Sequence, residues 1–278
     1  SRWSSSSSSA TVTSSKMAAD TLHTPRPHTG PAPGTPGISL HGLTLAYGRR
    51  VLLRDADAVL PQGSITALIG RNGTGKSTIG RILAGLLKEK SGEVVLFGKH
   101  CRSKGRLGKV WYIPQDLDSQ LFGEDLLDEL TTGAEVSPER KQAAEEILEA
   151  LELMPFIKQH PSTLSGGQKQ RLALLCATLH EPPVLFLDEP TSGVDARTRR
   201  DFWKHISAMT TAGAAVLVTT HFMEEAEYCD RIALIYRGAM ISMGTPDELK
   251  ASCTEVEDPT LEEAFIASIE KYDREHPQ

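Results

Sequence analysis

The sequence Gly70-Arg71-Asn72-Gly73-Thr74-Gly75-Lys76-Ser77-Thr78 lies between two segments of different character. Ser64–Ile69 before it is a short apolar run typical of a buried strand, and Thr78–Leu87 after it has the pattern of a helix. The stretch matches G-x-x-x-x-G-K-[ST], a loop whose backbone N–H groups bind nucleotide phosphates. With a strand before the match and a helix after it, we predict a nucleotide-binding loop rather than an ordinary glycine turn.

Each residue type in this loop has a physical role. The glycines allow left-handed backbone conformations and a close approach of the chain to phosphate oxygens. The ammonium group of Lys76 can reach the outer phosphates, and the hydroxyl of Ser77 can bind magnesium. The N-terminus of the following helix adds partial positive charge.

The composition limits the class of protein. The 278 residues carry a net charge of −6, with 24% charged and 39% hydrophobic residues, as is ordinary for a soluble globular protein. A negative net charge leads us to expect no nucleic-acid partner. No apolar run approaches the roughly 20 residues of a membrane-spanning helix. The four cysteines form no C-x-x-C pair and indicate reduced buried thiols in a cytosolic protein.

The N-terminal segment has a composition of its own. It contains the serine run Ser4–Ser9 and the proline- and glycine-rich stretch Thr24–Gly34. Because such a segment buries too little apolar surface to offset its conformational entropy, we predict that residues 1–36 are disordered. Met17 is the first methionine, and we expect the native chain to begin there.

The rest of the chain alternates between strand and helix patterns. Apolar runs predict strands at 39–47, 92–97, 110–113, 183–187, 215–220, 231–236 and 239–243, the last two forming a hairpin. Helical spacing predicts helices within 126–157, from 164 to 177, at 198–207, and after capping boxes at Thr245 and Thr260. His100 and Cys101 are expected in a polar loop, and Cys176 in the core.

Polar or aromatic side chains stand at the ends of several predicted strands. Asp188 and Glu189 end a buried run, and beside a phosphate-binding loop two adjacent carboxylates fit a magnesium ligand and a base for water. Gln115 and His221 follow two other strands, where a single polar side chain is usually structural. Tyr47 ends the first strand, and it either packs on the core or offers a ring on which adenine stacks.

A second potential anion site precedes the helix that contains Cys176. In Ser165-Gly166-Gly167 a serine and two glycines stand at the helix N-terminus, where free N–H groups and the helix dipole favour negative charge.

Together, these segments resemble the ATP-binding-cassette (ABC) ATPase family from about Ile38 to the C-terminus. The elements that carry the resemblance are an adenine-stacking aromatic at Tyr47, a Walker A loop at Gly70–Thr78, a Q-loop glutamine at Gln115, a signature at Leu164–Gln168, a Walker B pair at Asp188-Glu189, a D-loop at Ser192–Asp195 and a switch histidine at His221. Val194 stands in the D-loop where leucine is commoner. The resemblance implies an α/β P-loop NTPase fold with a RecA-like core, an N-terminal antiparallel β subdomain and an α-helical signature subdomain at about 116–180. The ATPase domain would span 37–248, followed by a C-terminal helical extension at 249–278.

The resemblance also implies the cofactors ATP and Mg²⁺ and a role for each site residue. Glu189 would be the general base, assisted by Lys76, Gln115 and His221. ATP would be bound by Tyr47, Gly70, Asn72, Gly73, Gly75, Lys76, Ser77 and Thr78, and from a second cassette closing head to tail by Ser165, Gly166, Gly167 and Asp195. Magnesium would be held by Ser77, Gln115 and Asp188.

The family resemblance implies partners as well. ATP would close two cassettes, and their movement would pass to a separate transmembrane permease. We therefore expect a homodimer or a heterodimer with another cassette, peripheral to the cytoplasmic face of the cell membrane. Tyr112–Thr163 is similar to energy-coupling-factor and cobalt or nickel importers, whereas the chain from Leu172 onward is similar to ABC-2 drug exporters. The stretch from Leu172 onward is the longer one, and it favours the exporter. A metal or vitamin importer is the alternative. A recombined chain would also combine resemblances to both classes.

Other classes fit the sequence less well. Cassette ATPases acting on DNA carry long coiled coils or zinc modules between positions matching Gln115 and Ser165, and this insert is short and lacks a cysteine cluster. Ribosome-acting relatives usually carry two cassettes in one chain. A catalytically dead module would not need both Glu189 and His221, and kinases or GTPases lack the signature. The sequence therefore favours a transporter motor.

Overall fold

The computed structural model describes residues 36–277 apart from 132–137, 139–141, 143–144, 147, 150–151, 193 and 255. Of residues 1–36, which were predicted to be disordered, only Pro36 belongs to the described part. Pro36 begins the first strand, so the prediction was wrong at this residue. Much of the stretch 141–151, within the helical region predicted at 126–157, also lies outside it. No helix of the described residues is long and apolar enough to span a membrane.

A six-stranded sheet forms the centre of the fold. Its spatial order is β10 (Ala239–Gly244), β9 (Arg231–Tyr236), β3 (Ile65–Ile69), β8 (Ala215–Thr220), β7 (Val184–Asp188) and β6 (Val110–Ile113). The five strands from β9 to β6 are parallel, and β10 joins β9 as an antiparallel edge. All five parallel strands therefore end at the same edge of the sheet, which is where such folds bind ligands.

The central strands are buried on both faces, which explains their continuous apolar runs. Since side chains alternate along a strand, Leu185 and Leu187 of β7 join one core and Phe186 joins the other. The first core lies against α6 (Gly166–His180) and α7 (Ala196–Thr211). The second lies against α2 (Lys76–Leu83) and a second sheet.

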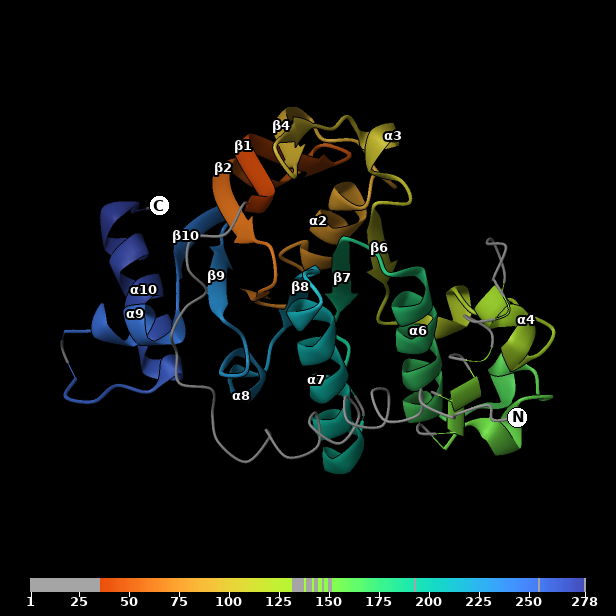
Figure 1. The fold of residues 1–278 in the computed structure, drawn as a ribbon. Coiled ribbons are helices and arrows are strands. Elements are labelled where there is room, and N and C mark those ends of the chain that lie inside the picture. The colour runs from red at the N-terminus through yellow and green to blue at the C-terminus, as the bar shows by residue number, and fades with distance from the viewer. Residues whose placement is uncertain are drawn as a thin grey trace, which may run out of the picture. The chain divides into compact units, whose positions relative to one another are not determined.

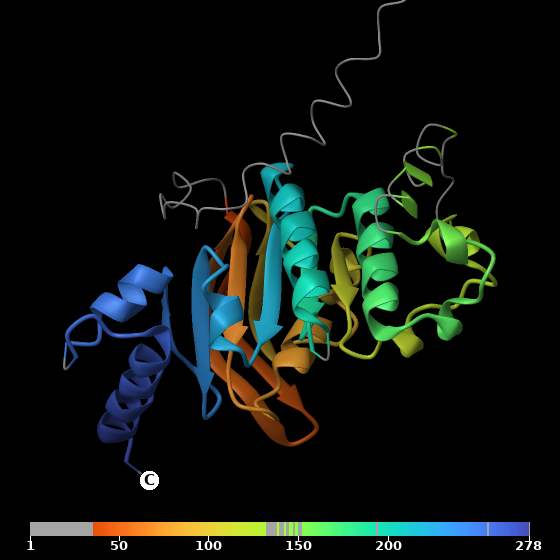
Figure 2. The ribbon, with the colours of Figure 1, turned by 90° about the horizontal axis from the view of Figure 1, so that it is seen from below.

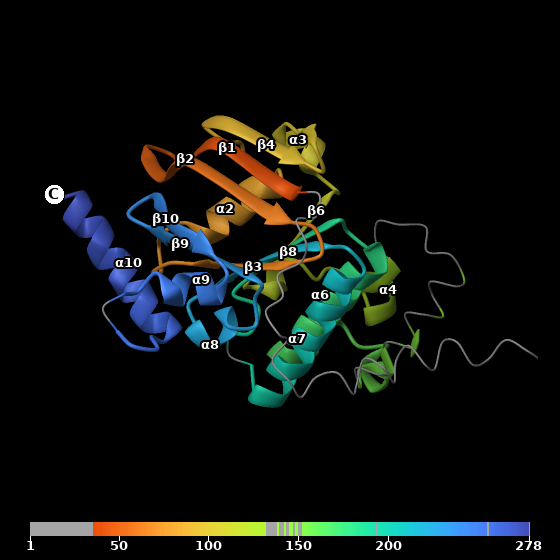
Figure 3. The same cartoon turned by 60° about the vertical axis from the view of Figure 1, so that its left-hand side comes forward.

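The second sheet is antiparallel, with the order β2 (Arg50–Pro61), β1 (Pro36–Tyr47), β4 (Ser91–Leu96) and β5 (Lys99–His100). Figure 3 shows α2 between this sheet and the parallel sheet. The helix passes very close to β7 at Gly80, because a Cβ atom there would lie 2.2 Å from the ring of Phe186. Glycine at this position thus allows the phosphate-loop helix to lie directly on the sheet.

The remaining elements flank these layers (Figures 1 and 2). Between α2 and α6 lie α3 (Ser103–Arg106), η1 (Leu117–Ser119), α4 (Leu126–Thr131), η2 (Met154–Phe156) and η3 (Pro161–Thr163). After β8 come α8 (Met223–Ala226), α9 (Pro246–Ala251) and α10 (Leu261–Glu275). The capping boxes predicted at Thr245 and Thr260 are confirmed as the starts of α9 and α10. Leu261 and Ala264 are buried and Phe265 packs on the core, so α10 docks on the domain.

Two expectations about local structure were wrong, and one strand was not predicted. The helix after the phosphate loop ends at Leu83 instead of Leu87, because Gly85 takes a left-handed φ of 80°. His100 lies in the short strand β5 rather than in a loop. The strand β2 was not predicted, because a left-handed residue, Asp55, and register shifts interrupt its alternating pattern.

A buried ion pair fixes the end of α2. Arg106 is fully buried; its guanidinium donates to the carbonyls of Cys101 and Ile82 at 2.7 and 2.9 Å and pairs with Glu89 at 2.6 Å. Burial raises the pKa of Glu89, but the hydrogen bond and charge of Arg106 outweigh this effect, so that the pKa is lowered from its ordinary value of 4.5. The pair therefore holds the carbonyl end of α2 against α3.

Glu89→Ala is expected to lower the free energy of unfolding by about 3 kcal/mol, because it leaves the buried Arg106 guanidinium without a counter-charge. Urea unfolding at pH 7 measures the loss. The matched control is Glu93→Ala, whose partner His100 is exposed, so no measurable change is expected. The difference between wild type and Glu89→Ala should shrink as the pH falls below 4.5, because the unfolded carboxylate binds protons first and the native one, whose pKa is lower, becomes protonated only at lower pH. An equal loss in both variants would contradict this account.

Candidate active site

Four neighbouring strand ends supply the predicted polar residues of the site. The phosphate loop follows β3, His221 follows β8, Asp188 ends β7, and Gln115 lies two residues beyond β6. Because these strands are adjacent and parallel, their carboxyl ends bring residues from four distant parts of the sequence to one edge of the sheet.

The phosphate loop has the backbone conformation that its glycines allow. Gly73 and Gly75 have φ values of 79° and 96°, in the left-handed region that other residues rarely adopt. Gly75 is the N-cap residue of α2, and Leu52 packs 3.0 Å from where a Cβ atom at Gly75 would lie. The loop is closed by Thr74, whose N–H and hydroxyl donate to the carbonyl of Arg71 at 3.2 and 2.8 Å. The predicted loop geometry is therefore present at the start of a helix.

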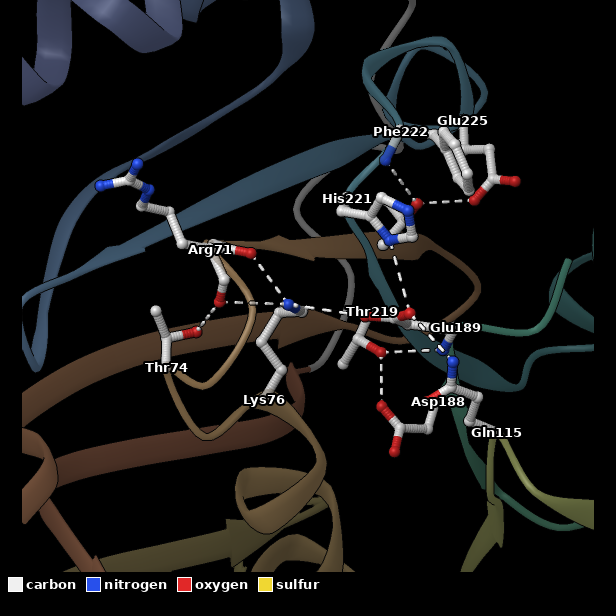
Figure 4. A network of polar contacts seen from close by, with 12 residues as sticks. Arg71, Thr74, Lys76, Gln115, Asp188, Glu189, Thr219, His221, Phe222 and Glu225 are labelled. Carbon is white, nitrogen blue, oxygen red and sulfur yellow. Dashed lines mark hydrogen bonds and ion pairs between the residues drawn. The ribbon is translucent and has the colours of Figure 1, made fainter. Parts of the chain in front are cut away.

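Lys76 points back into this loop (Figure 4). Its side chain is buried, and Nζ donates to the carbonyls of Gly70 at 2.8 Å and Arg71 at 3.5 Å. Nζ also lies 3.6 Å from Oε1 of Glu189. A buried ammonium held by carbonyls and one carboxylate can exchange a partner for a phosphate oxygen without leaving its place.

Glu189 connects the other predicted polar residues. Its Oε2 accepts a hydrogen bond from Nε2 of Gln115 at 3.3 Å and lies 3.4 Å from Nδ1 of His221. The Glu189 side chain is only 14% exposed. The structure thus brings Lys76, Gln115 and His221 around one carboxylate at the phosphate loop, although each is contributed by a different segment.

The backbone at Glu189 is held in an unusual conformation. Its φ is 46°, a left-handed value that costs a non-glycine residue free energy. The Glu189 N–H donates to the carbonyl and hydroxyl of Thr219 at 3.1 and 2.9 Å, which stabilises this conformation from β8. Such over-determined strain is common where a reactive side chain must point in one direction.

Asp188 is buried, and both of its carboxylate oxygens accept hydrogen bonds. Thr219 donates to Oδ1 at 2.7 Å, and Tyr112 donates to Oδ2 at 2.9 Å. Burial and the charge of Asp188 raise the pKa of Tyr112 to about 12, so its phenol remains a donor. Neither donor was predicted from the sequence, where the only signal was a polar residue inside each buried strand.

Other predicted residues lie on exposed surfaces. Tyr47 is 68% exposed, which contradicts packing on the core and leaves its ring free for stacking. Ser165 lies at the N-terminus of α6, as predicted, and caps it through a capping box with Gln168, while open space surrounds Gly166. Asp195 caps α7, and hydrogen bonds from Thr198 lower the pKa of its carboxyl group. Among the described residues, Tyr47, Ser165 and Asp195 form no hydrogen bond with the phosphate loop.

One link between the Tyr47 hairpin and the phosphate loop was not predicted. Arg50 pairs with Tyr47 across the β1–β2 turn, and its guanidinium donates to the carbonyl of Gly73 at 3.0 Å. This arginine therefore holds the exposed aromatic hairpin beside the loop.

Known proteins resemble this chain over most of its length. Residues 53–192, which include the phosphate loop, Gln115, Ser165 and Glu189, match the family described as "ABC transporter". The chain belongs to the ABC transporter family. It carries an ABC ATP-binding domain of the P-loop NTPase fold, and the α/β fold class and the ATP-binding function predicted from the sequence are confirmed.

Relatives within the ABC transporter family include a protein named for multidrug transport and one named for an energy-coupling-factor transporter. The chain is 43% identical over 255 residues to the "Probable multidrug ABC transporter ATP-binding protein YbhF" of Escherichia coli (strain K12), covering 87% of this chain and 44% of YbhF. The chain thus spans less than half the length of that relative. It is 30% identical over 238 residues to the "Energy-coupling factor transporter ATP-binding protein EcfA1" of Mycoplasma genitalium, covering 83% of this chain and 87% of EcfA1.

Solved ABC structures have the same fold. The "ATP binding subunit of ABC transporter" superimposes with a TM-score of 0.73 at 26% identity, over 84% of this chain and 99% of that one. The cbiO1 protein of Clostridium perfringens, titled "Part of the ABC transporter complex cbiONQ", gives a TM-score of 0.69 at 25% identity, over 87% of this chain and 96% of that one.

Proposed function

We propose that this cassette hydrolyses ATP with Glu189 as the general base and passes the resulting movement to a separate membrane permease. The observation that carries the catalytic part is the position of Glu189 between Lys76, Gln115 and His221 at the phosphate loop. Lys76 would offset the charge that develops on the γ-phosphate, and Glu189 would polarise the attacking water. His221 would hold the γ-phosphate on the side of β8.

Magnesium fits the oxygen atoms available at this edge. Asp188 retains accepting capacity beyond its bonds to Thr219 and Tyr112, because a carboxylate has about four lone-pair sites. Ser77 offers a hydroxyl in the first turn of α2, and Gln115 offers its amide oxygen while its Nε2 bonds to Glu189. Carboxylate, hydroxyl and amide oxygens are the hard ligands that magnesium prefers. When bound, the ion would neutralise charge on the phosphates.

We further propose that a second cassette completes each site. Ser165 and Gly166 are exposed at the N-terminus of α6, a 15-residue helix that offers free N–H groups to an anion. The Ser165 oxygen accepts from the N–H of Gln168, which leaves its hydroxyl proton available for a phosphate oxygen. Gly167 and Asp195 would contribute from the same surface. The γ-phosphate would then lie between Lys76 of one cassette and this helix of the other, in a homodimer or a heterodimer.

ATP-dependent association tests the trans site. Sedimentation velocity of Glu189→Gln should show a doubled mass with ATP and Mg²⁺, and a single cassette after EDTA is added or when Ser165 is replaced by arginine. An arginine at the cap would place a bulky side chain where the phosphate must approach. Full-rate hydrolysis by a chain that sediments as a monomer under the assay conditions would contradict the proposal.

The role of Tyr47 in adenine binding leads to a separate prediction. Tyr47→Ala is expected to raise the Kd for ATP by about tenfold, because stacking of a base on an aromatic ring contributes roughly 1–3 kcal/mol. Tyr47→Phe should retain the affinity, since the ring remains. Tyr228→Ala is the matched control, because this tyrosine is 65% exposed and stacks on Trp203 instead. Fluorescence titration with a labelled ATP measures all three, and equal affinities for wild type and Tyr47→Ala would exclude the stacking role.

The proposed permease partner would dock on the Gln115 side of the cassette. Phe122, seven residues beyond Gln115, is 76% exposed, and aromatic residues are enriched in protein–protein interfaces. We propose an ABC-2 type exporter, supported by the resemblance from Leu172 onward and by the name of the relative YbhF. An importer is the alternative, supported by the resemblance to EcfA1 and cbiO1. In either case the cassette would lie at the cytoplasmic face of the membrane, with 37–248 as the ATPase domain and 249–278 as a helical extension.

A further inference from the structure

A buried carboxylate outside the proposed catalytic set lies just behind His221. Glu225 is on the short helix α8 and only 1% exposed. Burial raises the pKa of Glu225, and the hydrogen bond from Thr220 and the charge of Arg199 oppose this effect. Burying a carboxyl group costs free energy unless hydrogen bonds or opposite charges compensate it. The contacts of Glu225 therefore indicate its role.

Glu225 joins two segments that lead to the active site. The hydroxyl of Thr220 donates to Oε2 at 2.6 Å, and the hydroxyl of Thr191 donates to Oε1. Thr191 is also 1% exposed and lies two residues after Glu189, whereas Thr220 immediately precedes His221. One carboxylate therefore connects the chain that leaves the proposed base to the chain that enters the proposed switch histidine.

The hydroxyl of Thr220 has a second bond that encloses His221. It accepts the N–H of Phe222 at 3.0 Å, so that the residues before and after His221 are joined across the turn (Figure 4). A hydroxyl has one proton to donate, and that of Thr220 is donated in the hydrogen bond to Glu225. The carboxylate thereby orients the Thr220 oxygen toward the Phe222 N–H and fixes the backbone from which the imidazole projects.

A helix outside the nucleotide edge supports the same turn. Nε of Arg199, on α7, lies 3.8 Å from Oε1 of Glu225, and its guanidinium lies over the Phe222 ring at 5.7 Å from the centroid. The ring of Phe222 in turn contacts that of His221, with 4.0 Å between centroids. Glu225 is therefore at the centre of contacts that hold both flanks of His221.

We propose that Glu225 is a positioning residue that sets the placement of His221 against Glu189 by holding Thr220 and Thr191. This inference rests on the proposed catalytic roles of Glu189 and His221. Within the part of the chain that the structure describes, Glu225 forms no hydrogen bond or ion pair with Glu189 or with the phosphate loop. It therefore acts through the two threonines. Its removal should therefore slow the chemical step while leaving ATP affinity nearly unchanged.

Thr220→Val tests this idea with little change in shape or strand propensity. Single-turnover hydrolysis is expected to fall about tenfold or more, because small misplacements of catalytic groups have effects of this size or larger. The Kd for ATP should stay within about twofold, since that affinity depends on the phosphate loop. Thr220→Ser, which keeps the hydroxyl, should restore most of the rate. Glu225→Gln should behave like Thr220→Val, and Glu224→Gln on the exposed face of α8 is the matched control.

The His221→Ala background separates positioning from general damage. If Glu225 and Thr220 act through His221, then Thr220→Val should cause no further loss in that background. An equal loss with and without His221, or an unchanged rate for Thr220→Val in the native background, would overturn the inference. The proposed function fails differently: it is wrong if Glu189→Gln and His221→Ala themselves leave hydrolysis intact.

Discussion

Replacing Glu189 by glutamine is expected to reduce ATP hydrolysis by about 10²–10⁴-fold, the range typical for loss of a general base. The amide has nearly the same shape as the carboxylate but cannot take a proton from water. Glutamine also removes a negative charge 3.6 Å from the Lys76 ammonium. ATP should therefore bind as tightly as in wild type or more tightly, because the γ-phosphate no longer faces a carboxylate.

Single-turnover assays with enzyme in excess over labelled ATP separate this loss from effects on product release. The Kd for ATP is measured on the same preparation. The control is Glu224→Gln, which removes the same charge from an exposed glutamate on α8. This variant should hydrolyse ATP at the wild-type rate. A Glu189→Gln protein that retains a third or more of the wild-type rate would exclude Glu189 as the base.

Lys76→Met is the substitution expected to affect ATP binding most. The Lys76 ammonium is buried in the phosphate loop, with Nζ 2.8 Å from the Gly70 carbonyl. Removing one member of a buried, hydrogen-bonded charge pair costs roughly 2–5 kcal/mol, so we expect the Kd for ATP to rise by about 10²-fold. The substitution also leaves Glu189 without its cationic partner, which adds repulsion toward phosphate.

Calorimetric titration of Lys76→Met with ATP measures the affinity, and thermal unfolding without nucleotide shows whether the fold is kept. Lys88→Met, just beyond α2 and exposed, is the matched control and should bind ATP normally. If Lys76→Met binds ATP within about threefold of wild type, the assignment of Lys76 to the phosphates is incorrect.

Sequence patterns predicted the central sheet better than the elements around it. β6, β8 and β9 match their predicted bounds, because strands buried on both faces are uninterrupted apolar runs. β2 has one exposed face, and Asp55 with a φ of 45° breaks its alternation, so its pattern was hidden. The end of α2 was misplaced because Ala84–Leu87 continues the apolar spacing beyond the glycine that ends the helix.

Some residues of the active site could be predicted from the sequence and others could not. Lys76 and Glu189 were predicted from the phosphate loop and from the carboxylate pair beside it, whereas Gln115 and His221 were predicted only through the family resemblance. Tyr112 could not, because its hydroxyl bonds to Asp188, 76 positions away, through a pairing of strands that sequence alone does not give. Thr219 and Glu225 could not be predicted for the same reason: each is a buried polar residue whose hydrogen-bond partner is known only from the fold.

Purification of tagged Glu189→Gln protein from detergent-solubilised membranes of its native host, with ATP and Mg²⁺, tests the transporter account most directly. Mass spectrometry should identify a polytopic permease, of the ABC-2 exporter type if our preference is correct. Phe122→Asp in the same background should lose that protein while ATP still pairs the cassettes. A small scaffold subunit with a substrate-capture protein would instead indicate an importer. Recovery of no membrane protein, although ATP still drives pairing, would contradict the proposal that this cassette powers transport.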